Sequence, residues 1–281
     1  MRRARRHLPV ALSRVARGAG LAELLFWPAL VAYGEAAVAY AGEARRPGLA
    51  GRAATWGVRI GWLAQAGLLA AQVASGDGFP WATWAGSLNL FVWLVVSAYL
   101  IWGCRSGYRL LGLAVMPLTV LLLVLAHVGG GTGDLGGSNY SNGFLVLHVG
   151  LALVGFAGLT LAAALAGLYL WQERRLKRRE ARILRLHVPA LVTLDAVAGR
   201  TIAVSLPILT LGMVAGLVRL VGEGASVDAL IAVTLATWLV YGSFLVLRYG
   251  AGWRGRRAAY LAVSGLALVL AVHFGLPVTH F

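Results

Sequence analysis

The chain has 281 residues, of which 59% are hydrophobic and only 12% are charged, and its formal net charge is +15. Soluble domains carry roughly 25% charged residues, so this composition excludes an ordinary soluble protein and indicates one embedded in a membrane. The single cysteine, Cys104, excludes an internal disulfide, a CxxC redox pair and the CxxCH attachment motif of a c-type cytochrome.

Eight apolar runs follow one another along the chain, and each is long enough to cross the hydrocarbon core of a bilayer as a helix. They are Leu21–Tyr40, Thr55–Ser75, Trp81–Gly103, Leu110–Val128, Phe144–Trp171, Thr201–Val221, Ala229–Leu247 and Ala259–Leu276. None alternates with the two-residue period of a membrane barrel strand. The sequence therefore predicts an all-α, polytopic integral membrane protein. Residues 1–20 form a basic N-terminal tail, and residues 21–281 form a single transmembrane helical domain.

The basic residues are concentrated in alternate loops. The loops after spans 1, 3, 5 and 7 hold 17 Lys and Arg residues, whereas those after spans 2, 4 and 6 hold only Arg219. Basic loops stay in the cytoplasm, so this distribution predicts that both termini lie outside, in a bacterial inner or plasma membrane. It also argues against a nucleic-acid partner.

The N-terminal stretch "MRRARRHLPVALSRVARG" conflicts with this orientation, because it places six arginines outside. It also resembles the start of a signal peptide, with "AYA" at residues 39–41 as a cleavage motif. We prefer the uncleaved form with eight spans, because the charge distribution over seven loops is stronger evidence for the orientation than the charge of one tail. The tail then lies outside or on the membrane surface, unless translation starts further along the chain.

Two charged residues inside the first two spans are predicted to pair. Glu35 and Arg59 lie on either side of one cytoplasmic loop, and an antiparallel hairpin would place them at similar depth. A charge inside a membrane helix is costly unless it is paired, so we expect an ion pair here.

Four of the six histidines are predicted to lie near the external face: His127, His148, His273 and His280. A single buried histidine is often only a polar core residue, but an ionisable group within a membrane helix marks a candidate functional site. Imidazole binds haem iron, zinc and copper. No carboxylate or thiolate cluster accompanies these histidines, which favours haem held by two imidazoles. Whether His280, His273 or His127 faces His148 stays open.

Three segments, in this order, resemble the CcsA/ResC/HemX family of cytochrome c assembly membrane proteins. They are "FPWATWAGSLNLFVWLVVSAYLIWGCRSGYRLLGLAVMPL", "NGFLVLHVGLALVGFAGLTLAAALAGLYLWQERRLKRR" and "LDAVAGRTIAVSLPILTLGMVAGLV", followed by "TWLVYGSFLVLRYGAGWRGRRAAYLAVSGLALVL". The Gly-Trp-Arg-Gly element at 252–255 belongs to the last segment. The resemblance covers most of the chain.

The resemblance implies that two external histidines bind haem on either side of a tryptophan-rich loop, and the expected cofactor is haem b. His148 matches the first, and His280 is the nearest match to the second. Asp228 keeps its place before Trp238, but the loop "VRLVGEGASVDALIAV" lacks the tryptophans of the family's WWD motif. The intramembrane histidine that the family carries in span 7 falls on Val246. These departures resemble a HemX-like branch.

Arg219 ends span 6 at the predicted level of His148 and His280. There it is placed to pair with a haem propionate. A snorkelling arginine at a helix end explains the same position without any ligand.

The favoured function is a membrane factor in cytochrome c biogenesis that binds or handles haem at the external face. Its expected partners are haem, the lipid bilayer, an apocytochrome c and a second membrane assembly component. One alternative is a HemX-like regulator of haem biosynthesis that meets an early pathway enzyme through the cytoplasmic loop at Arg174–Arg185. A transporter is the other alternative, although no convincing internal repeat supports it. No nucleophile–base pair or paired carboxylates are evident, which favours a binding factor over an enzyme.

Overall fold

The computed structural model describes residues 8–45, 49–75, 83–103, 111–133, 143–179, 189–223 and 229–275. Every regular element in these residues is an α-helix, which confirms the predicted all-α fold. The helices are α1 Leu8–Arg45, α2 Leu49–Ser75, α3 Trp84–Gly103, α4 Gly112–Val128, α5 Gly143–Lys177, α6 Leu191–Glu223, α7 Ala229–Gly250 and α8 Arg256–Gly275.

Five described stretches are long and apolar enough to cross a membrane. They are Gly20–Arg45, Trp84–Ile101, Val146–Lys177, Leu191–Val218 and Ile231–Gly250, while Gly112–Val128 is apolar but shorter. The helices also run beyond the predicted spans: α1 begins at Leu8, inside the predicted tail, and α6 begins at Leu191. Helical hydrogen bonding does not stop at the edge of the hydrocarbon, so charged turns extend the apolar cores of these helices.

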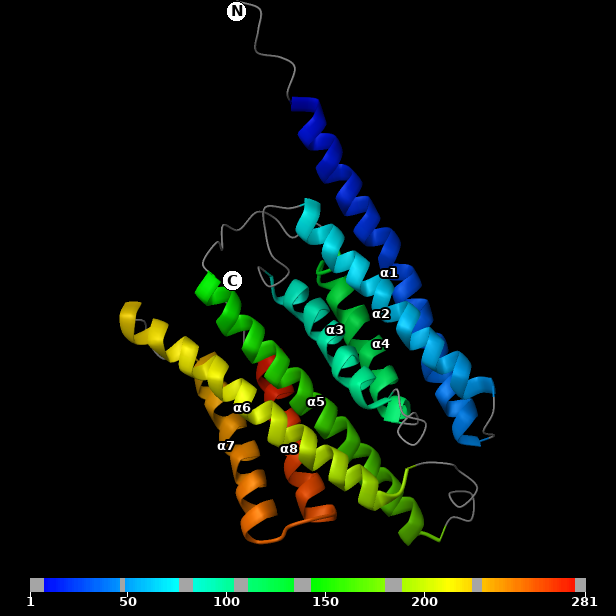
Figure 1. Ribbon diagram of the computed structural model, residues 1–281, viewed down its shortest axis with the longest axis vertical. Helices are drawn as coiled ribbons and strands as arrows, with labels where there is room; N and C mark the ends of the chain where they lie inside the picture. Colours follow the sequence, from blue (N-terminus) through cyan, green and yellow to red (C-terminus); the bar gives the residue numbers. More distant parts are fainter. Residues whose placement is uncertain are drawn as a thin grey trace, which may run out of the picture.

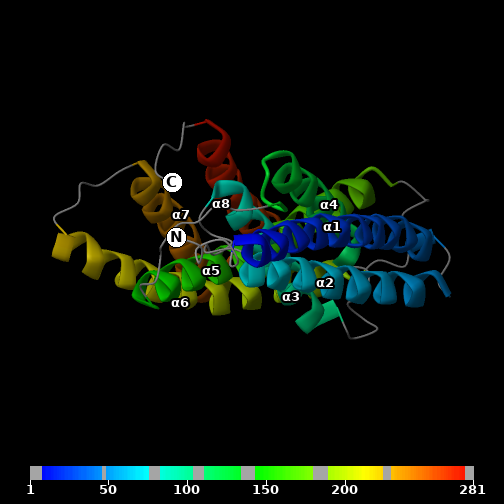
Figure 2. The ribbon, with the colours of Figure 1, turned by 90° about the horizontal axis from the view of Figure 1, so that it is seen from above.

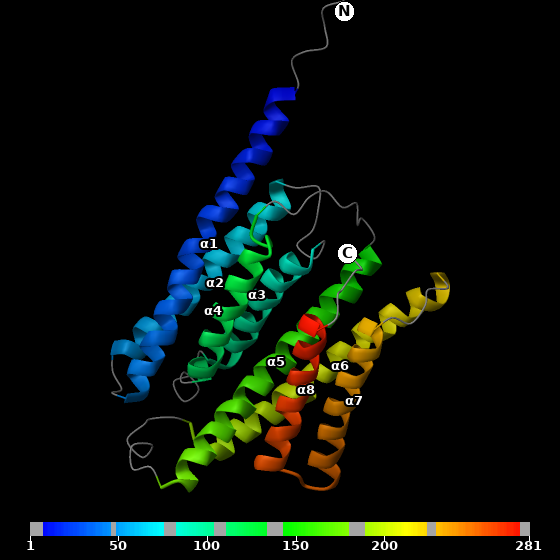
Figure 3. The same cartoon turned by 180° about the vertical axis from the view of Figure 1, so that it is seen from behind.

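The helices run up and down the long axis of the molecule and form two groups (Figures 1 and 3). In one group α1 and α2 form a long antiparallel hairpin, and α3 and α4 pack beside it. In the other, α5 and α6 pair along their length, with α7 and α8 packed against them. Seen from above, α5 lies between α1 and α6 (Figure 2).

Helix α5 joins the two groups because its two faces enter different hydrophobic cores. One face contributes Ala157, Leu161, Leu165 and Leu168 to the core shared with α1–α4. The other contributes Leu159, Ala162, Ala166 and Leu170 to the core shared with α6–α8. Each set recurs every three or four residues, as one side of an α-helix must. A helix apolar all round is thus placed at the centre of the protein.

A buried chain of hydrogen bonds ties the first group together. The Tyr33 hydroxyl donates to Gln65 Oε1 over 2.9 Å, and Gln65 Nε2 donates to Asn89 Oδ1 over 2.9 Å. Gln72 Nε2 donates over 3.0 Å to the carbonyl of Gly131, in the turn after α4. All four side chains are buried, where an unpaired polar group would cost several kcal/mol. The bonds therefore fix α1, α2, α3 and this turn in one register.

The predicted ion pair between Glu35 and Arg59 is wrong. Both residues are described, but the Arg59 guanidinium lies over the Trp56 ring, 5.2 Å from its centroid, and Glu35 is exposed on α1. Small residues fill the hairpin interface at this depth, where a Cβ added to Gly57 would lie 3.1 Å from the Ala32 carbonyl oxygen. The hairpin places the two positions at a similar level, but the two charged side chains do not point towards each other.

Small residues also let α5 and α6 approach closely. A Cβ added to Gly155 would lie 2.8 Å from Leu209 Cβ and 2.9 Å from Leu209 Cα, and one added to Gly158 would collide with Ser205. On the other helix, a Cβ at Gly212 would lie 2.9 Å from the Ala152 nitrogen. Glycines at such contacts are a common means of bringing membrane helices together.

We expect Gly155→Ala to lower the free energy of unfolding by about 1–3 kcal/mol, because the added methyl group meets the backbone of α6. Gly167→Ala is the matched control on the same helix, since an added Cβ there meets nothing within 4 Å. The control should be neutral, or more stable by up to about 1 kcal/mol through helix propensity. Reversible unfolding in mixed micelles, followed by circular dichroism, measures both. Equal effects at the two positions would contradict the close α5–α6 contact.

Candidate functional site

His148 lies at the contact between α5 and α6. Its Nδ1 is 2.6 Å from the carbonyl oxygen of Gly212, and the ring is partly buried. The two residues are 64 positions apart in the chain, so the antiparallel pairing of α5 and α6 creates the contact. It lies in the first turns of α5 and towards the C-terminal end of α6, at one end of this helix pair (Figure 1).

A second glycine makes room for the imidazole. Gly216 follows Gly212 by one helical turn, so both positions lie on the same face of α6. A Cβ added to Gly216 would collide with the Cε1 atom of His148 and lie 2.9 Å from its Nδ1 and 3.1 Å from its Nε2. The ring therefore lies directly against the α6 backbone, in space that any side chain at 216 would occupy.

The bond to Gly212 determines the chemistry of the ring. A carbonyl oxygen only accepts hydrogen bonds, so Nδ1 carries the proton and donates it. In the neutral ring the lone pair then lies on Nε2, which has no hydrogen bond within the described part of the chain. Histidines that ligate metals commonly have this arrangement, with the other ring nitrogen donating to a carbonyl that fixes the tautomer and raises the basicity.

His127 occupies a different environment, in the first helix group. Its Nδ1 is 2.6 Å from Thr132 Oγ1, and its ring stacks on Phe26 with the centroids 3.8 Å apart and the planes 10° from parallel. Trp27 meets the same ring edge-on at 5.9 Å. Thr132 and two aromatic side chains of α1 thus hold His127 in the packing between α4 and α1, while His148 faces α6.

The other predicted site residues are placed only in part. His280 and Asp228 lie outside the described residues. Arg219 is a helical position of α6 and His273 one of α8. By spacing, position 219 continues the face of α6 that carries Gly212 and Gly216. In the described part of the chain, no group of three or more His, Cys, Asp and Glu residues is arranged to hold a metal ion.

Sequence reasoning missed a partly buried ion pair at the opposite end of the second group. Arg248 Nη2 of α7 lies 2.8 Å from Asp195 Oδ2 of α6, and the side chains are only 11% and 13% exposed. The guanidinium also donates to the Asp195 carbonyl over 3.1 Å, and the Gly255 N–H donates to Asp195 Oδ1 over 2.9 Å. One carboxylate thus connects α6, α7 and the turn into α8. The sequence did contain a signal for this ion pair, because both charged residues lie within or beside apolar runs.

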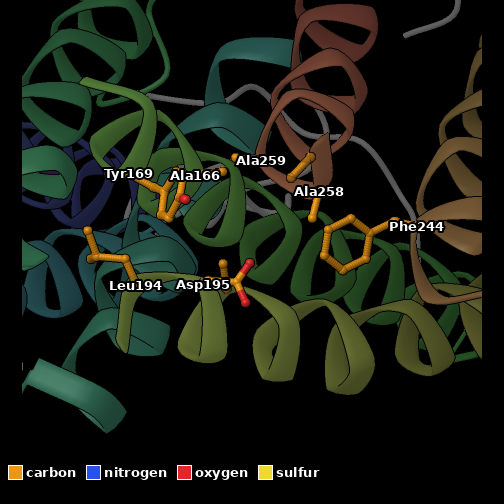
Figure 4. A pocket seen from close by; sticks show the side chains of 9 residues that line it. Ala166, Tyr169, Leu194, Asp195, Phe244, Ala258 and Ala259 are labelled. Atoms are coloured by element: carbon orange, nitrogen blue, oxygen red, sulfur yellow. The ribbon is translucent and has the colours of Figure 1, made fainter. Parts of the chain in front are cut away.

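A small pocket adjoins this ion pair (Figure 4). It is lined from α5, α6, α7 and α8, mostly by alanines, with Tyr169, Leu194, Asp195 and Phe244 as its larger side chains. Its carboxylate already accepts bonds from Arg248 and Gly255. The pocket therefore belongs to the structural junction of four helices and offers no open set of ligands.

We expect Arg248→Gln to lower the free energy of unfolding by about 3 kcal/mol, because it leaves the Asp195 carboxylate buried without its cation. Lys177→Gln is the control. It also removes the cation of an ion pair, with Glu173, but the Lys177 side chain is 60% exposed. Its effect should stay below about 0.5 kcal/mol. The measurement is unfolding in mixed micelles together with hydrogen exchange of the Gly255 amide, which should speed up only in Arg248→Gln. Unchanged exchange would contradict the role given to Asp195.

Known proteins resemble this chain over most of its length. The sequence model of the family described as "Cytochrome C assembly protein" matches residues 81–280. The cytochrome c biogenesis protein CcsA of Synechococcus elongatus is 28% identical over 270 residues, which covers 79% of this chain and 83% of the relative. CcsA of Microcystis aeruginosa is 27% identical, over 78% of this chain and 82% of the relative. CcsA of a Picosynechococcus species is 25% identical, with coverage of 83% and 86%.

No solved structure matches the chain. The family match spans well over half of the sequence and includes the positions of His148, Arg219, Asp228 and His280. Together with helices long and apolar enough to cross a bilayer several times, it identifies the chain as a multi-pass membrane protein that belongs to the cytochrome c assembly protein family.

Proposed function

We propose that this protein holds or passes haem at the external face of a bacterial cell membrane during cytochrome c assembly, with His148 as one axial ligand. The observation that carries the proposal is the bond from His148 Nδ1 to the Gly212 carbonyl. It fixes the tautomer whose Nε2 lone pair is suited to haem iron.

The donor set fits haem better than it fits a hydrated metal ion. His148 supplies an imidazole between two apolar helices, and no acidic or thiolate cluster surrounds it in the described residues. Haem b would supply the iron and two propionates, while the protein supplies an oriented imidazole. Gly216 supports the fit, because it leaves the ring space at the α6 backbone.

The remaining parts of the proposed site come from the family resemblance and from spacing. His280 is the proposed second axial ligand, with His273 as the alternative, because Phe26 and Thr132 hold the imidazole of His127 in the packing between α4 and α1. Arg219, two turns beyond Gly212 on α6, is proposed to pair with a propionate, and Asp228 belongs to the adjoining loop. The proposed partners are an apocytochrome c that receives the haem and a second membrane component.

A regulator of haem biosynthesis is the second candidate, and two observations favour it. The loop between α6 and α7 carries no tryptophan. At the position of the family's intramembrane histidine in span 7 stands Val246, which is 72% exposed on the outside of α7. Such a HemX-like protein would meet a cytoplasmic enzyme through the basic segment Arg174–Arg185.

Absorption spectra of the detergent-purified protein, oxidised and reduced, test the haem site. We expect wild type to give the sharp spectrum of six-coordinate haem, and His148→Ala and His280→Ala each to lose or alter it. His127→Asn is the control and should leave the spectrum unchanged, because its imidazole is held by Phe26 and Thr132. A colourless wild type after expression with added haem would contradict stable ligation, and the regulator would then take precedence.

Gly216→Ala tests the geometry of the site without removing a ligand. The added methyl group collides with the His148 ring, so we expect haem affinity to fall by at least tenfold, or the spectrum to change to that of a five-coordinate species. Gly150→Ala is the matched control near His148, since an added Cβ there meets nothing within 4 Å. Equal haem titration curves for the two variants would contradict the position given to the ring.

A further inference from the structure

Helix α1 carries an exposed stripe with one acid in it. The stripe comprises Leu21, Leu24, Pro28, Val31, Glu35 and Val38, spaced alternately by three and four residues. Its apolar members are open, with Leu24 66% exposed, Val31 63% and Val38 74%. An apolar stripe of this kind faces lipid in a membrane, but the carboxylate of Glu35 does not suit that surrounding.

Helix α6 carries a similar stripe with one base in it. Here the exposed residues are Val192, Arg200, Val204, Pro207, Leu211, Val214 and Val218. Val204 is 62% exposed, Leu211 60% and Val214 53%. No ion pair or hydrogen bond within the described residues reaches Glu35 or Arg200. A charge that stays unpaired within the hydrocarbon of a bilayer is costly, so each of these two residues calls for a partner of opposite charge.

The two charges lie at similar distances along their helices from the same end of the molecule. Arg45 ends α1 and Leu191 begins α6 at the same end of the molecule (Figure 1). At about 1.5 Å per residue, Glu35 lies about 15 Å from Arg45, and Arg200 lies about 14 Å from Leu191. Within one chain they stay apart, because α1 and α6 belong to different helix groups on either side of α5 (Figure 2).

We propose that copies of this chain associate head to tail in the membrane, with α1 of one copy against α6 of the next and Glu35 paired with Arg200. Charge complementarity at a similar distance from this end selects a second copy as the occupant of each stripe. The proposal is independent of haem binding.

The register of the two stripes supports this pairing. The helices run in opposite directions, so residues before Glu35 meet residues after Arg200. Counted away from the charges on this side, four exposed positions of one stripe match four of the other. The pairs are Val31 with Val204, Pro28 with Pro207, Leu24 with Leu211, and Leu21 with Val214. Because the contact uses two different surfaces, it generates rings or open rows of copies rather than a closed two-fold dimer.

Disulfide cross-linking in native membranes tests the register. In a Cys104→Ser background, the double variant Val31→Cys/Val204→Cys should form a ladder of dimers, trimers and higher species on non-reducing gels. Val31→Cys/Leu63→Cys is the matched control, because Leu63 of α2 is 62% exposed and lies at a similar depth. The control should form no ladder. A missing ladder in the first variant, an equal ladder in the control, or a dimer from Val31→Cys alone would each overturn the proposal.

Charge reversal tests the ion pair in the same cross-linking assay. Glu35→Arg and Arg200→Glu should each lower the ladder yield at least tenfold, and the double reversal should restore it to within about twofold. Co-expression of the two single variants should also restore it, since unlike copies then alternate, and this result shows that both variants are folded. Glu23→Gln, at an exposed acid near the other end of the span, should change nothing. The proposal would be overturned if the single reversals left the ladder yield unchanged. It would also be overturned if the ladder yield stayed low in both the double variant and the mixture.

Discussion

The close contact between α5 and α6 is the constraint on which the rest of the structure depends. Glycines on both helices remove the side chains that would otherwise separate the two backbones. The contact has two consequences: α5 is held at the boundary of the two cores, and a main-chain carbonyl of α6 comes within reach of His148. In a bilayer this contact cannot arise from burial of apolar surface alone, because lipid is as apolar as leucine. Shape complementarity therefore has to supply it.

The two helix groups satisfy their polar side chains in different ways. The first group uses neutral amides and hydroxyls, linked from Tyr33 through Gln65 to Asn89. The second uses one ion pair, placed where α6, α7 and the turn before α8 meet. Neutral networks tolerate mid-membrane depth better than charges do, whereas the ion pair lies at the helix ends, closer to water. Of these two polar arrangements, the charged one therefore lies where the dielectric penalty is smaller.

Much of the architecture could be predicted from the sequence, because apolar run length nearly determines a membrane helix. His148 could be singled out for a related reason: an imidazole in such a run is costly and therefore informative. The depth of a residue in a span does not say in which direction around the helix axis its side chain points. For this reason the predicted pairing of Glu35 with Arg59 was wrong. The bond from Arg248 to Asp195, across 53 residues, and the stacking of His127 on Phe26 depend on how helices approach one another. No pattern within one helix reveals such contacts.

The bond between His148 and the Gly212 carbonyl has a mechanical consequence. The electron density available at Nε2 depends on how firmly Nδ1–H is held, and the acceptor belongs to a neighbouring helix rather than to a side chain. Sliding α6 along α5 by a single residue would move that oxygen by about 1.5 Å, enough to break the bond. The capacity of Nε2 to donate its lone pair therefore depends on the relative position of the two helices. A displacement of α6 caused at the far end of the helix pair would change this capacity without any contact at the ring itself.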